Sequence, residues 1–458
     1  MGRSGPALER WLSIRFNESK GGMTMRRTIR LCVLVGCLAG LLAVPAGASA
    51  QTQPWSTFTY TNNMHPLGFS ARGNTTSPFT ANSDLAFWGK TAYHGNYDGF
   101  RIIDVTEPDN PVELNDYRGC AGNQGDVIIW RNILVRSWNS PAPAGATCDG
   151  EPVPQGWEGV HVFDVSNPAD PDLVASVETE CGSHTATGVP DPANNRLLVY
   201  NNASSGACPG LDIIGVPLAN PSGATLLHDF TQVPAGRSCH DTGVILGDAL
   251  KAACAGGNGF SVFSMDPADG GSLEQPKFLY SIVVPGVTIG HSAAFTWDGE
   301  VIIFGHEPGG GGQARCQATS STVDKTLFFF DADTGAKVGE FVNPRPQTAT
   351  ENCTWHNYNV VPTSGGYILV AAQYQGGISV VDFSDPAGAK EIAFADPAPL
   401  STTQLILGGD WSDYWYNGRI YESDITRGLL IWRLSDKAVA NAMTLGHLNP
   451  QTQEFTIG

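Results

Sequence analysis

Short alternating strands separated by tight turns dominate the hydrophobic pattern of this sequence. The clearest segments are GFRIIDVTEPDNPVEL from Gly99, GVHVFDVSNPADPDLV from Gly159 and GISVVDFSDPAGAKEI from Gly377. In each, a glycine opens an alternating apolar stretch, an aspartate ends it, and a turn-forming cluster precedes a second apolar stretch. Alternation with a period of two predicts a β-strand, and Pro, Asn and Asp favour the turn that follows. Each segment is therefore a predicted strand–turn–strand unit.

The same unit recurs in weaker form, which brings the number of copies to seven. The weaker copies begin at Leu211, Phe260, Thr326 and Gly428. Two further short strands joined by a tight turn precede the copies, and the clearest pairs are 84–87 with 91–94, 127–130 with 133–135, and 414–416 with 419–421. Four antiparallel strands in a unit of roughly 40 to 65 residues are typical of a β-propeller blade.

Seven such units predict an all-β fold, a seven-bladed β-propeller of four-stranded antiparallel blades. The ring must close, and segment 65–71 aligns with outer strands such as 111–114, so we expect it to be the fourth strand of the seventh blade. Segment 453–457 is the alternative closing strand. Nothing in the pattern indicates a second domain, and residues 51–458 are expected to form one propeller domain.

The three clear copies, from Gly99, Gly159 and Gly377, resemble the LVIVD-repeat family. The resemblance covers nearly all of the chain after residue 51, and it implies a secreted or cell-surface β-propeller. Each residue of the repeat has a packing or turn role, so the resemblance says almost nothing about activity.

The composition agrees with many short strands joined by tight turns. Hydrophobic residues make up 41% of the chain and charged residues 15%, with 54 glycines and 30 prolines. Such a composition excludes disorder along the whole length.

The N-terminus has the pattern of an export signal. A basic stretch, MRRTIR over 25–30, is followed by an apolar run over 31–44 and by Ala48-Ser49-Ala50. This arrangement predicts a signal peptide over 25–50, an unstructured extension over 1–24 and a secreted, extracellular mature chain. The apolar run is too short to span a bilayer, so we expect no integral membrane segment in the mature chain. Twin-Arg export and a lipoprotein-like site at Cys37 remain open as alternatives.

The predicted mature chain is strongly acidic. Without residues 1–51, 19 Lys and Arg and 42 Asp and Glu remain, a formal net charge of about −23. Such a charge disfavours nucleic acid and anionic membrane surfaces as partners, and it keeps a secreted protein soluble. We expect a monomer that binds a small molecule, a glycan or a protein at one propeller face.

Eight of the ten cysteines follow the predicted signal peptide, an even set for an oxidising compartment. Four precede an inner strand and four follow a second strand, which places all eight on one face. Disulfides are expected rather than thiolate metal sites, because the sequence contains no C-x-x-C pair. The pairs that this topology favours are Cys120–Cys148, Cys181–Cys208, Cys239–Cys254 and Cys316–Cys353.

Four histidines occupy one equivalent position in four successive predicted blades. Inner strands of a propeller start beside the central channel, so side chains in this register can converge there. Four neutral imidazoles would bind a divalent transition metal such as Fe, Cu or Zn, with the aspartate of the series as a fifth ligand or an acceptor of a ring N–H. Counting back from the first turn of each blade gives Asn82, Gln124, His184, His240, His291, His356 and Asp410.

The loop after the second strand of a blade returns to the same face. In the fifth blade this loop begins His306-Glu307 and continues into four glycines at 309–312. We interpret His306 as a further ligand and Glu307 as a general base, or both as a solvated loop end. In the seventh blade, Glu422 and Asp424 hold the matching place. Aromatic residues near predicted strand starts, among them Tyr374 and Trp411, either stack on a ligand or pack between blades.

Two functions remain after these observations. In the first, the chain is a secreted or cell-surface binding module and its histidines are structural, as the Gly-His pair of WD-repeat propellers is; Gly290-His291 fits that pattern. In the second, it is a metal-dependent secreted oxidoreductase or oxygenase with a four-histidine centre. The sequence contains no G-x-S-x-G, no P-loop and no G-x-G-x-x-G after a strand, so hydrolase and nucleotide-binding signatures are absent.

Overall fold

Antiparallel β-strands make up most of the described structure. The computed structural model describes residues 54–72, 81–203, 208–230, 233–234 and 238–458, and the predicted signal peptide lies outside these residues. The chain divides after Gln51, so all described residues belong to the unit Thr52–Gly458. Within them no helix is long and apolar enough to span a membrane. The helices described are short 3-10 turns: η1 (Pro54–Thr57), η2 (Pro192–Asn194), η3 (Pro221–Gly223), η4 (Pro267–Asp269), η5 (Val323–Lys325), η6 (Pro386–Gly388) and η7 (Lys437–Val439).

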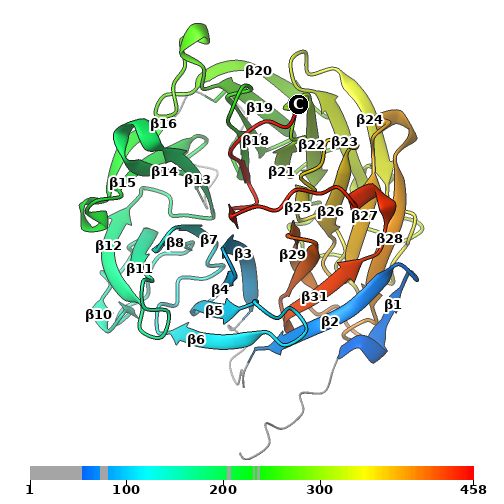
Figure 1. Cartoon of the computed structure of the whole chain (residues 1–458), viewed down its shortest axis with the longest axis horizontal. Coiled ribbons are helices and arrows are strands. Elements are labelled where there is room, and N and C mark those ends of the chain that lie inside the picture. Colours follow the sequence, from blue (N-terminus) through cyan, green and yellow to red (C-terminus); the bar gives the residue numbers. More distant parts are fainter. Residues whose placement is uncertain (1–53, 73–80, 204–207, 231–232, 235–237) are drawn as a thin grey trace, which may run out of the picture. The chain divides into compact units, whose positions relative to one another are not determined.

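Five sheets are each built around four antiparallel strands that are near one another in sequence, and Figure 1 shows them side by side around a common centre. The first holds β3 (Asn82–Trp88), β4 (Thr91–Asn96), β5 (Gly99–Asp104) and β6 (Val112–Arg118). The second holds β7 (Val127–Trp130), β8 (Ile133–Trp138), β11 (Gly159–Asp164) and β12 (Asp172–Glu178), with a ribbon of β9 (Thr147–Cys148) and β10 (Glu151–Pro152) in the β8–β11 connection. The third holds β13 (Thr185–Asp191), β14 (Arg196–Asn202), β15 (Leu211–Pro217) and β16 (Thr225–Phe230).

The fourth and fifth sheets continue in the same order. The fourth holds β17 (Asp241–Ile245), β18 (Lys251–Gly256), β19 (Gly259–Ser264) and β20 (Lys277–Val283). The fifth holds β21 (Gly290–Phe295), β22 (Val301–His306), β23 (Thr326–Asp331) and β24 (Lys337–Val342).

The sixth sheet has nine strands and contains the first and last long strands of the unit. Its strand order is β1-β28-β27-β26-β25-β29-β30-β31-β2. The β25–β29 pair is parallel, and every other neighbouring pair of this sheet is antiparallel. The bounds are β1 (Phe58–Tyr60), β2 (Met64–Ala71), β25 (Asn357–Val360), β26 (Ile368–Ala372), β27 (Ile378–Asp382), β28 (Lys390–Pro397), β29 (Asp410–Tyr416), β30 (Arg419–Asp424) and β31 (Gly428–Leu434).

The N-terminal strand β2 pairs with β31, from Met64 opposite Leu434 to Ala71 opposite Gly428. This confirms the sequence prediction that segment 65–71 completes the last group of strands. The alternative closing segment lies elsewhere, because β33 (Thr452–Gln453) runs parallel to β17. Strand β1, which adds an edge to β28, was not among the predicted elements.

One irregularity recurs at the same place in seven strand pairs. In each pair the register shifts near the middle, for example between Ile102 and Ile103 of β5 or between Val162 and Phe163 of β11. A bulge of this kind increases local twist, so its repetition shows that the outer part of each group bends in the same way. The pairs are β5–β6, β11–β12, β15–β16, β19–β20, β23–β24, β27–β28 and β31–β2.

Apolar side chains fill the space between neighbouring sheets. Between the second and third sheets, for instance, Ile128 and Val162 pack in one buried cluster with Leu197 and Ile214. The outer strands β6 and β12 are mostly exposed or half-buried, whereas the inner strands β3 and β7 are buried on both faces along most of their length. The sheets are therefore held together mainly by burial of the inner strands.

A polar C-terminal segment ties the inner strands together near the centre (Figure 1). Strand β32 (His447–Leu448) pairs with β3, and Asn449 both accepts from the N–H and donates to the carbonyl of Ile129 in β7, each at 2.8 Å. Thr452 donates to Gly188 of β13 at 2.6 Å, and Gln453 donates to Phe295 of β21 at 2.5 Å. One short segment thus connects the inner strands of several sheets.

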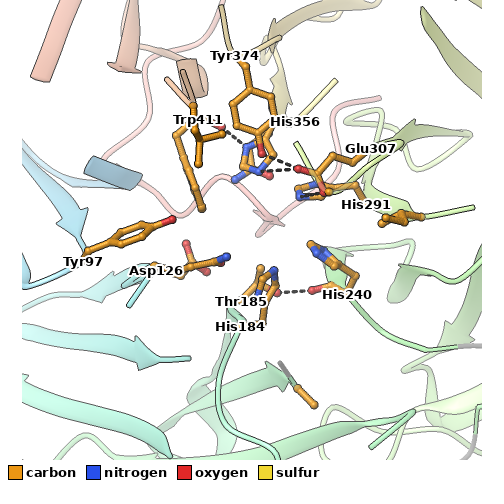
Figure 2. Close-up of a pocket in the computed structure, with 16 residues that line it drawn as sticks. Tyr97, Asp126, His184, Thr185, His240, His291, Glu307, His356, Tyr374 and Trp411 are labelled. Carbon is orange, nitrogen blue, oxygen red and sulfur yellow. Dashed lines mark hydrogen bonds and ion pairs between the residues drawn. The ribbon is translucent and has the colours of Figure 1, made fainter. Parts of the chain in front are cut away.

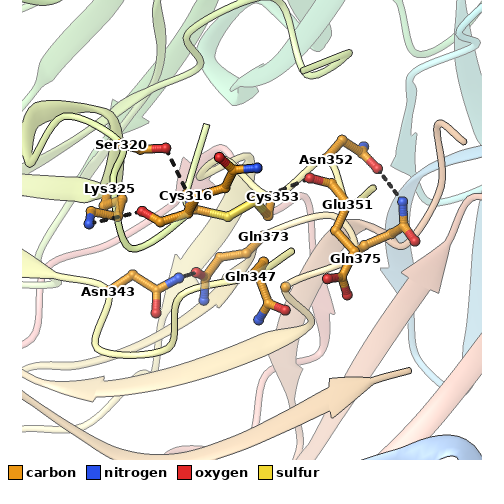
Figure 3. Close-up of a disulfide and its surroundings, with 12 residues drawn as sticks. Cys316, Ser320, Lys325, Asn343, Gln347, Glu351, Asn352, Cys353, Gln373 and Gln375 are labelled. Carbon is orange, nitrogen blue, oxygen red and sulfur yellow. Dashed lines mark hydrogen bonds between the residues drawn. A yellow bond between two sulfur atoms is a disulfide. The ribbon is translucent and has the colours of Figure 1, made fainter. Parts of the chain in front are cut away.

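The eight cysteines of the described region form four disulfides, the same pairs that the sequence predicts: Cys120–Cys148, Cys181–Cys208, Cys239–Cys254 and Cys316–Cys353. Figure 3 shows Cys316–Cys353, which joins the loop after β22 to the segment before β25. Beside it, the Gln375 side chain donates to Asn352 at 2.8 Å. Three of these disulfides end within three residues of a histidine that the sequence places at an inner strand start.

Candidate metal centre

The four predicted histidines line one pocket at the starts of four successive inner strands. His184, His240 and His356 come directly before β13, β17 and β25, and His291 is the second residue of β21. The pocket has a volume of about 320 Å³. Figure 2 shows the imidazoles around its opening, with Tyr97, Asp126 and Trp411 on the remaining side. The convergence expected from the sequence register is thus present.

The imidazole rings follow one another closely along the wall. Ring centroids lie 4.4 Å apart for His184 and His240, 4.3 Å for His240 and His291, and 4.3 Å for His291 and His356. Beyond His356, the rings of Tyr374 and Trp411 lie at 4.6 and 4.7 Å. The histidines therefore form one continuous arc bounded by aromatic side chains.

Hydrogen bonds at Nδ1 fix the orientation of three of the rings. Nδ1 of His356 donates to the carbonyl oxygen of Trp411 at 2.5 Å, and Nδ1 of His184 lies 2.9 Å from Oδ1 of Asn139. Nδ1 of His291 lies 2.6 Å from Oγ of Ser292, whose hydroxyl donates to the carbonyl of His356. Because the oxygens of Asn139 and Trp411 only accept, Nδ1 of His184 and of His356 carries the proton and Nε2 of these two rings carries the free lone pair, which is the arrangement of a metal-ligating histidine.

Glu307 faces two of these Nε2 atoms. Its carboxylate oxygens lie 3.9 Å from Nε2 of His291 and 3.9 Å from Nε2 of His356. These distances are too long for hydrogen bonds, but an ion about 2.0–2.2 Å from each atom would span them. Potential ligand atoms of His240, His291 and Glu307 all lie within 4.8 Å of one another.

Burial sets the protonation of this cluster. It lowers the pKa of His184 to about 4 and that of His356 to about 3, and it holds the pKa of His240 and His291 well below the ordinary value. Neutral imidazoles are the form that binds metal. Burial also raises the pKa of Glu307 to about 7, although the hydroxyl of Tyr374 donates to its Oε1 at 2.5 Å.

His306 lies outside the pocket lining, which corrects the role predicted for it as a further ligand. Successive side chains of a strand point to opposite faces, so the neighbours His306 and Glu307 diverge. Nε2 of His306 accepts the N–H of Thr288 at 3.2 Å, away from the pocket lining. Of the two candidates in this loop, Glu307 alone reaches the histidines.

Asp410 is also separate from the histidines. A register shift between Asp410 and Ser412 turns its side chain toward Glu422 and Asp424, with which it forms a buried group. Neither carboxylate oxygen of Asp410 accepts a ring N–H. Trp411 lines the pocket at the place predicted for Asp410. Of the two other residues in the predicted series, Gln124 lines the pocket and Asn82 does not.

Tyr97 and Asp126 line the pocket without having been singled out in the sequence. Asp126 follows Gln124 by two residues, so the register that identifies Gln124 also indicates that Asp126 lies near the start of the same inner strand. Its carboxylate accepts the backbone N–H of Ala186 at 2.8 Å. Burial and the nearby Asp84 raise the pKa of Asp126 well above its ordinary value. Tyr97 lies in the turn between β4 and β5, and no comparable pattern of residues marks it.

The chain is similar to a known protein family in its repeats. A family model described as LVIVD repeat matches residues 153–179 and 359–393, around two of the three clear copies. No curated protein matches the chain. A crystal structure of the computationally designed Ika8 protein, in its crystal packing No.1 in P63, aligns with a TM-score of 0.45 at 10% identity, covering 81% of this chain and 99% of that chain.

Proposed function

We propose that this chain, which carries LVIVD repeats, is a secreted seven-bladed β-propeller that binds a divalent transition metal in its central pocket. The seven recurring register shifts support the blade count, with the nine-stranded sheet contributing two blades, one on each side of the parallel β25–β29 pair. The four disulfides are consistent with an oxidising, extracellular location.

The orientation of the imidazoles carries the metal proposal. Histidines that served only the fold would be expected to use both ring nitrogens within their own blades. Here His184 and His356 bond to Asn139 and Trp411 of other strand groups through Nδ1. Nδ1 of His240 is buried without a partner, and the carboxylate of Glu307 faces Nε2 of His291 and of His356.

The donor set indicates the class of metal. Imidazole nitrogens with one carboxylate suit Fe(II), Cu(II) or Zn(II), whereas Ca²⁺ and Mg²⁺ prefer oxygen ligands. In this proposal His240, His291 and Glu307 hold the ion. His184, next to His240, and His356, next to His291, are the further candidate ligands. The metal would supply Lewis-acid or redox chemistry inside the pocket.

A metal-dependent oxidoreductase is the second candidate function. The pocket has room for a substrate next to the ligands, because its volume of about 320 Å³ is bordered by Tyr97 and Trp411 as well as by the histidines. A binding module that used the metal only to hold a ligand would need the same pocket. Assay of the loaded protein for oxygen or hydrogen peroxide consumption separates the two.

The experiment that tests metal binding is elemental analysis of the full chain purified without added metal, followed by titration with Fe(II), Cu(II) and Zn(II). We expect about one ion per chain, lost in the His240→Ala/His291→Ala double variant. His228→Ala is the matched control, because His228 pairs with Glu274 away from the pocket. Absence of stoichiometric binding in the parent protein, or unchanged binding in the double variant, would overturn the proposal.

A further inference from the structure

Four acidic side chains meet on one face of the β29–β30 hairpin. Asp410 lies opposite Asp424 and Asp413 lies opposite Glu422, and the register shift after Asp410 brings all four to the same side. All four residues are fully buried, at 0% exposure. Oxygen atoms of Asp410, Glu422 and Asp424 lie within 4.8 Å of one another.

Hydrogen-bond donors satisfy only part of this group. Asp424 accepts from the backbone N–H of Thr426 and Arg427 and pairs with the Arg427 guanidinium at 2.5 Å. One oxygen of Glu422 accepts the indole N–H of Trp432 at 2.6 Å. The other oxygen of Glu422 and both oxygens of Asp410 receive no N–H or hydroxyl donor from outside the acidic group.

Asp413 provides an independent indication that something else belongs there. Its ligand atoms are not part of the close three-residue group, yet it lies in β29 with Asp410 and opposite Glu422, its side chain reaches that of Asp410, and both of its oxygens are buried without a donor from outside the group. Five buried carboxylate oxygens thus receive no donor from outside the group, and Asp410 contacts only the carboxyl groups of Glu422 and Asp413, which can hydrogen-bond to it only while a proton is retained. Burying such groups uncompensated is costly, and one guanidinium cannot neutralise four carboxylates.

Protons or a cation can neutralise the group. Burial and mutual repulsion raise the pKa of Asp410 and Asp413 well above the ordinary value, and that of Glu422 to about 7. Without a cation, the group would therefore have to retain protons at neutral pH.

We propose that Asp410, Asp413 and Glu422 bind a hard divalent cation of the Ca²⁺ class, with Asp424 completing the acidic wall. Every available donor atom is a carboxylate oxygen, which selects Ca²⁺ over metals that prefer nitrogen or sulfur. Ca²⁺ takes six to eight oxygen ligands, and the five unpaired oxygens supply most of them. This site is distinct from the histidine pocket in both position and ligand chemistry.

The cation would stabilise the wall of the histidine pocket. The backbone N–H and carbonyl of Asp410 pair with those of Tyr374 at 2.9 and 3.1 Å. The next residue, Trp411, holds Nδ1 of His356 through its carbonyl. Fixing Asp410 therefore fixes the backbone that orients both Tyr374 and His356.

Terbium luminescence and calcium analysis of the full chain test this site. Excitation of tryptophan should sensitise bound Tb³⁺, because Trp432 donates directly to Glu422. We expect about one Ca²⁺ or Tb³⁺ per chain, an increase in Tm on adding Ca²⁺ to chelator-treated protein, and at least about tenfold weaker Tb³⁺ binding in Asp413→Asn.

The controls separate this site from other acidic groups and from the histidines. Asp333→Asn alters an exposed carboxylate that pairs with Lys251 and should leave Tb³⁺ binding unchanged. His240→Ala/His291→Ala should also retain it, so failure of the transition-metal proposal would not be mistaken for failure here. If the parent protein holds no Ca²⁺, shows no sensitised Tb³⁺ luminescence and has the same Tm with Ca²⁺ or chelator, the group is neutralised by protons and the proposal is wrong. Those measurements decide the question even if Asp413→Asn fails to fold.

Discussion

The Nδ1 atom of His356 donates to the carbonyl oxygen of Trp411 at 2.5 Å, across the parallel junction of β25 and β29. A carbonyl cannot donate, so this contact determines which nitrogen of His356 carries the proton. The same logic applies to His184, whose Nδ1 faces Oδ1 of Asn139. Hydrogen-bond partners of the rings therefore prepare the imidazoles for a ligand on Nε2.

The first prediction concerns Asn139, which touches the histidine rather than the metal. Asn139→Ala removes the acceptor of the His184 ring, and we expect metal affinity to fall about 10- to 100-fold, as is usual when the partner of a ligating histidine is lost. Titration calorimetry with Zn(II) measures this. Asn132→Ala is the control, since Asn132 bonds to Asp164 in an exposed turn. Equal affinity in both variants would show that the His184 ring needs no such support.

The second prediction concerns Glu307. Glu307→Gln keeps the shape of the side chain but removes its charge, so we expect metal affinity to fall about tenfold or more. In metal-free protein the same substitution is expected to be favourable, because it removes the cost of ionising a buried carboxyl group. The folded pKa is about 7 against 4.5 in the unfolded chain, so the parent protein loses stability relative to Glu307→Gln as pH rises from about 4.5 to 7. The expected slope is about 1.4 kcal/mol per pH unit.

Urea unfolding of both metal-free proteins at several pH values measures that difference. Comparing the two proteins cancels the opposite contribution of the buried histidines, whose lowered pKa values destabilise the fold as pH falls below about 6.5. Parallel stability curves would mean that Glu307 titrates as an ordinary exposed carboxyl.

Much of this fold was predictable because each strand group repeats the same pattern. The alternation in segments such as Gly99–Asp104, the turn clusters after them and the position of the cysteines are local features, and repetition fixes how they align. The histidine convergence followed from that alignment alone.

The errors arose where backbone irregularity broke the alignment. A register shift beside Asp410 turns its side chain away from the pocket and leaves Trp411 in its place, which no count of residues reveals. The opposite directions of His306 and Glu307 depend on where β22 ends, and strand ends are poorly defined by sequence. Asn449 contacts Ile129 at a separation of 320 residues, with no periodic pattern to predict it.

The third prediction concerns the disulfide Cys316–Cys353. It joins the loop that follows Glu307 to the segment that precedes His356, so it sets the separation of two candidate ligands. Replacing both cysteines by serine should lower the free energy of unfolding by about 2–4 kcal/mol and also weaken metal binding.

The matched control for that variant is Cys120→Ser/Cys148→Ser. This pair closes a loop of similar length, 28 against 37 residues, but neither cysteine adjoins a histidine of the pocket. We expect a similar loss of stability with metal affinity retained. If both double variants lose metal affinity equally, the disulfides act only through global stability.

The fourth prediction concerns the C-terminal segment at the centre of the sheets. Asn449 is buried and satisfies both the N–H and the carbonyl of Ile129, two backbone groups of an inner strand that would otherwise lack a partner at that edge. Asn449→Ala should therefore lower the free energy of unfolding by about 1–3 kcal/mol, measured by urea denaturation. Asn449→Asp should cost as much or more, because a carboxylate can still accept from the N–H but cannot donate to the carbonyl. If Asn449→Ala lowers the free energy of unfolding by less than Asn132→Ala, a variant in an exposed turn, the C-terminal segment contacts the inner strands without stabilising them.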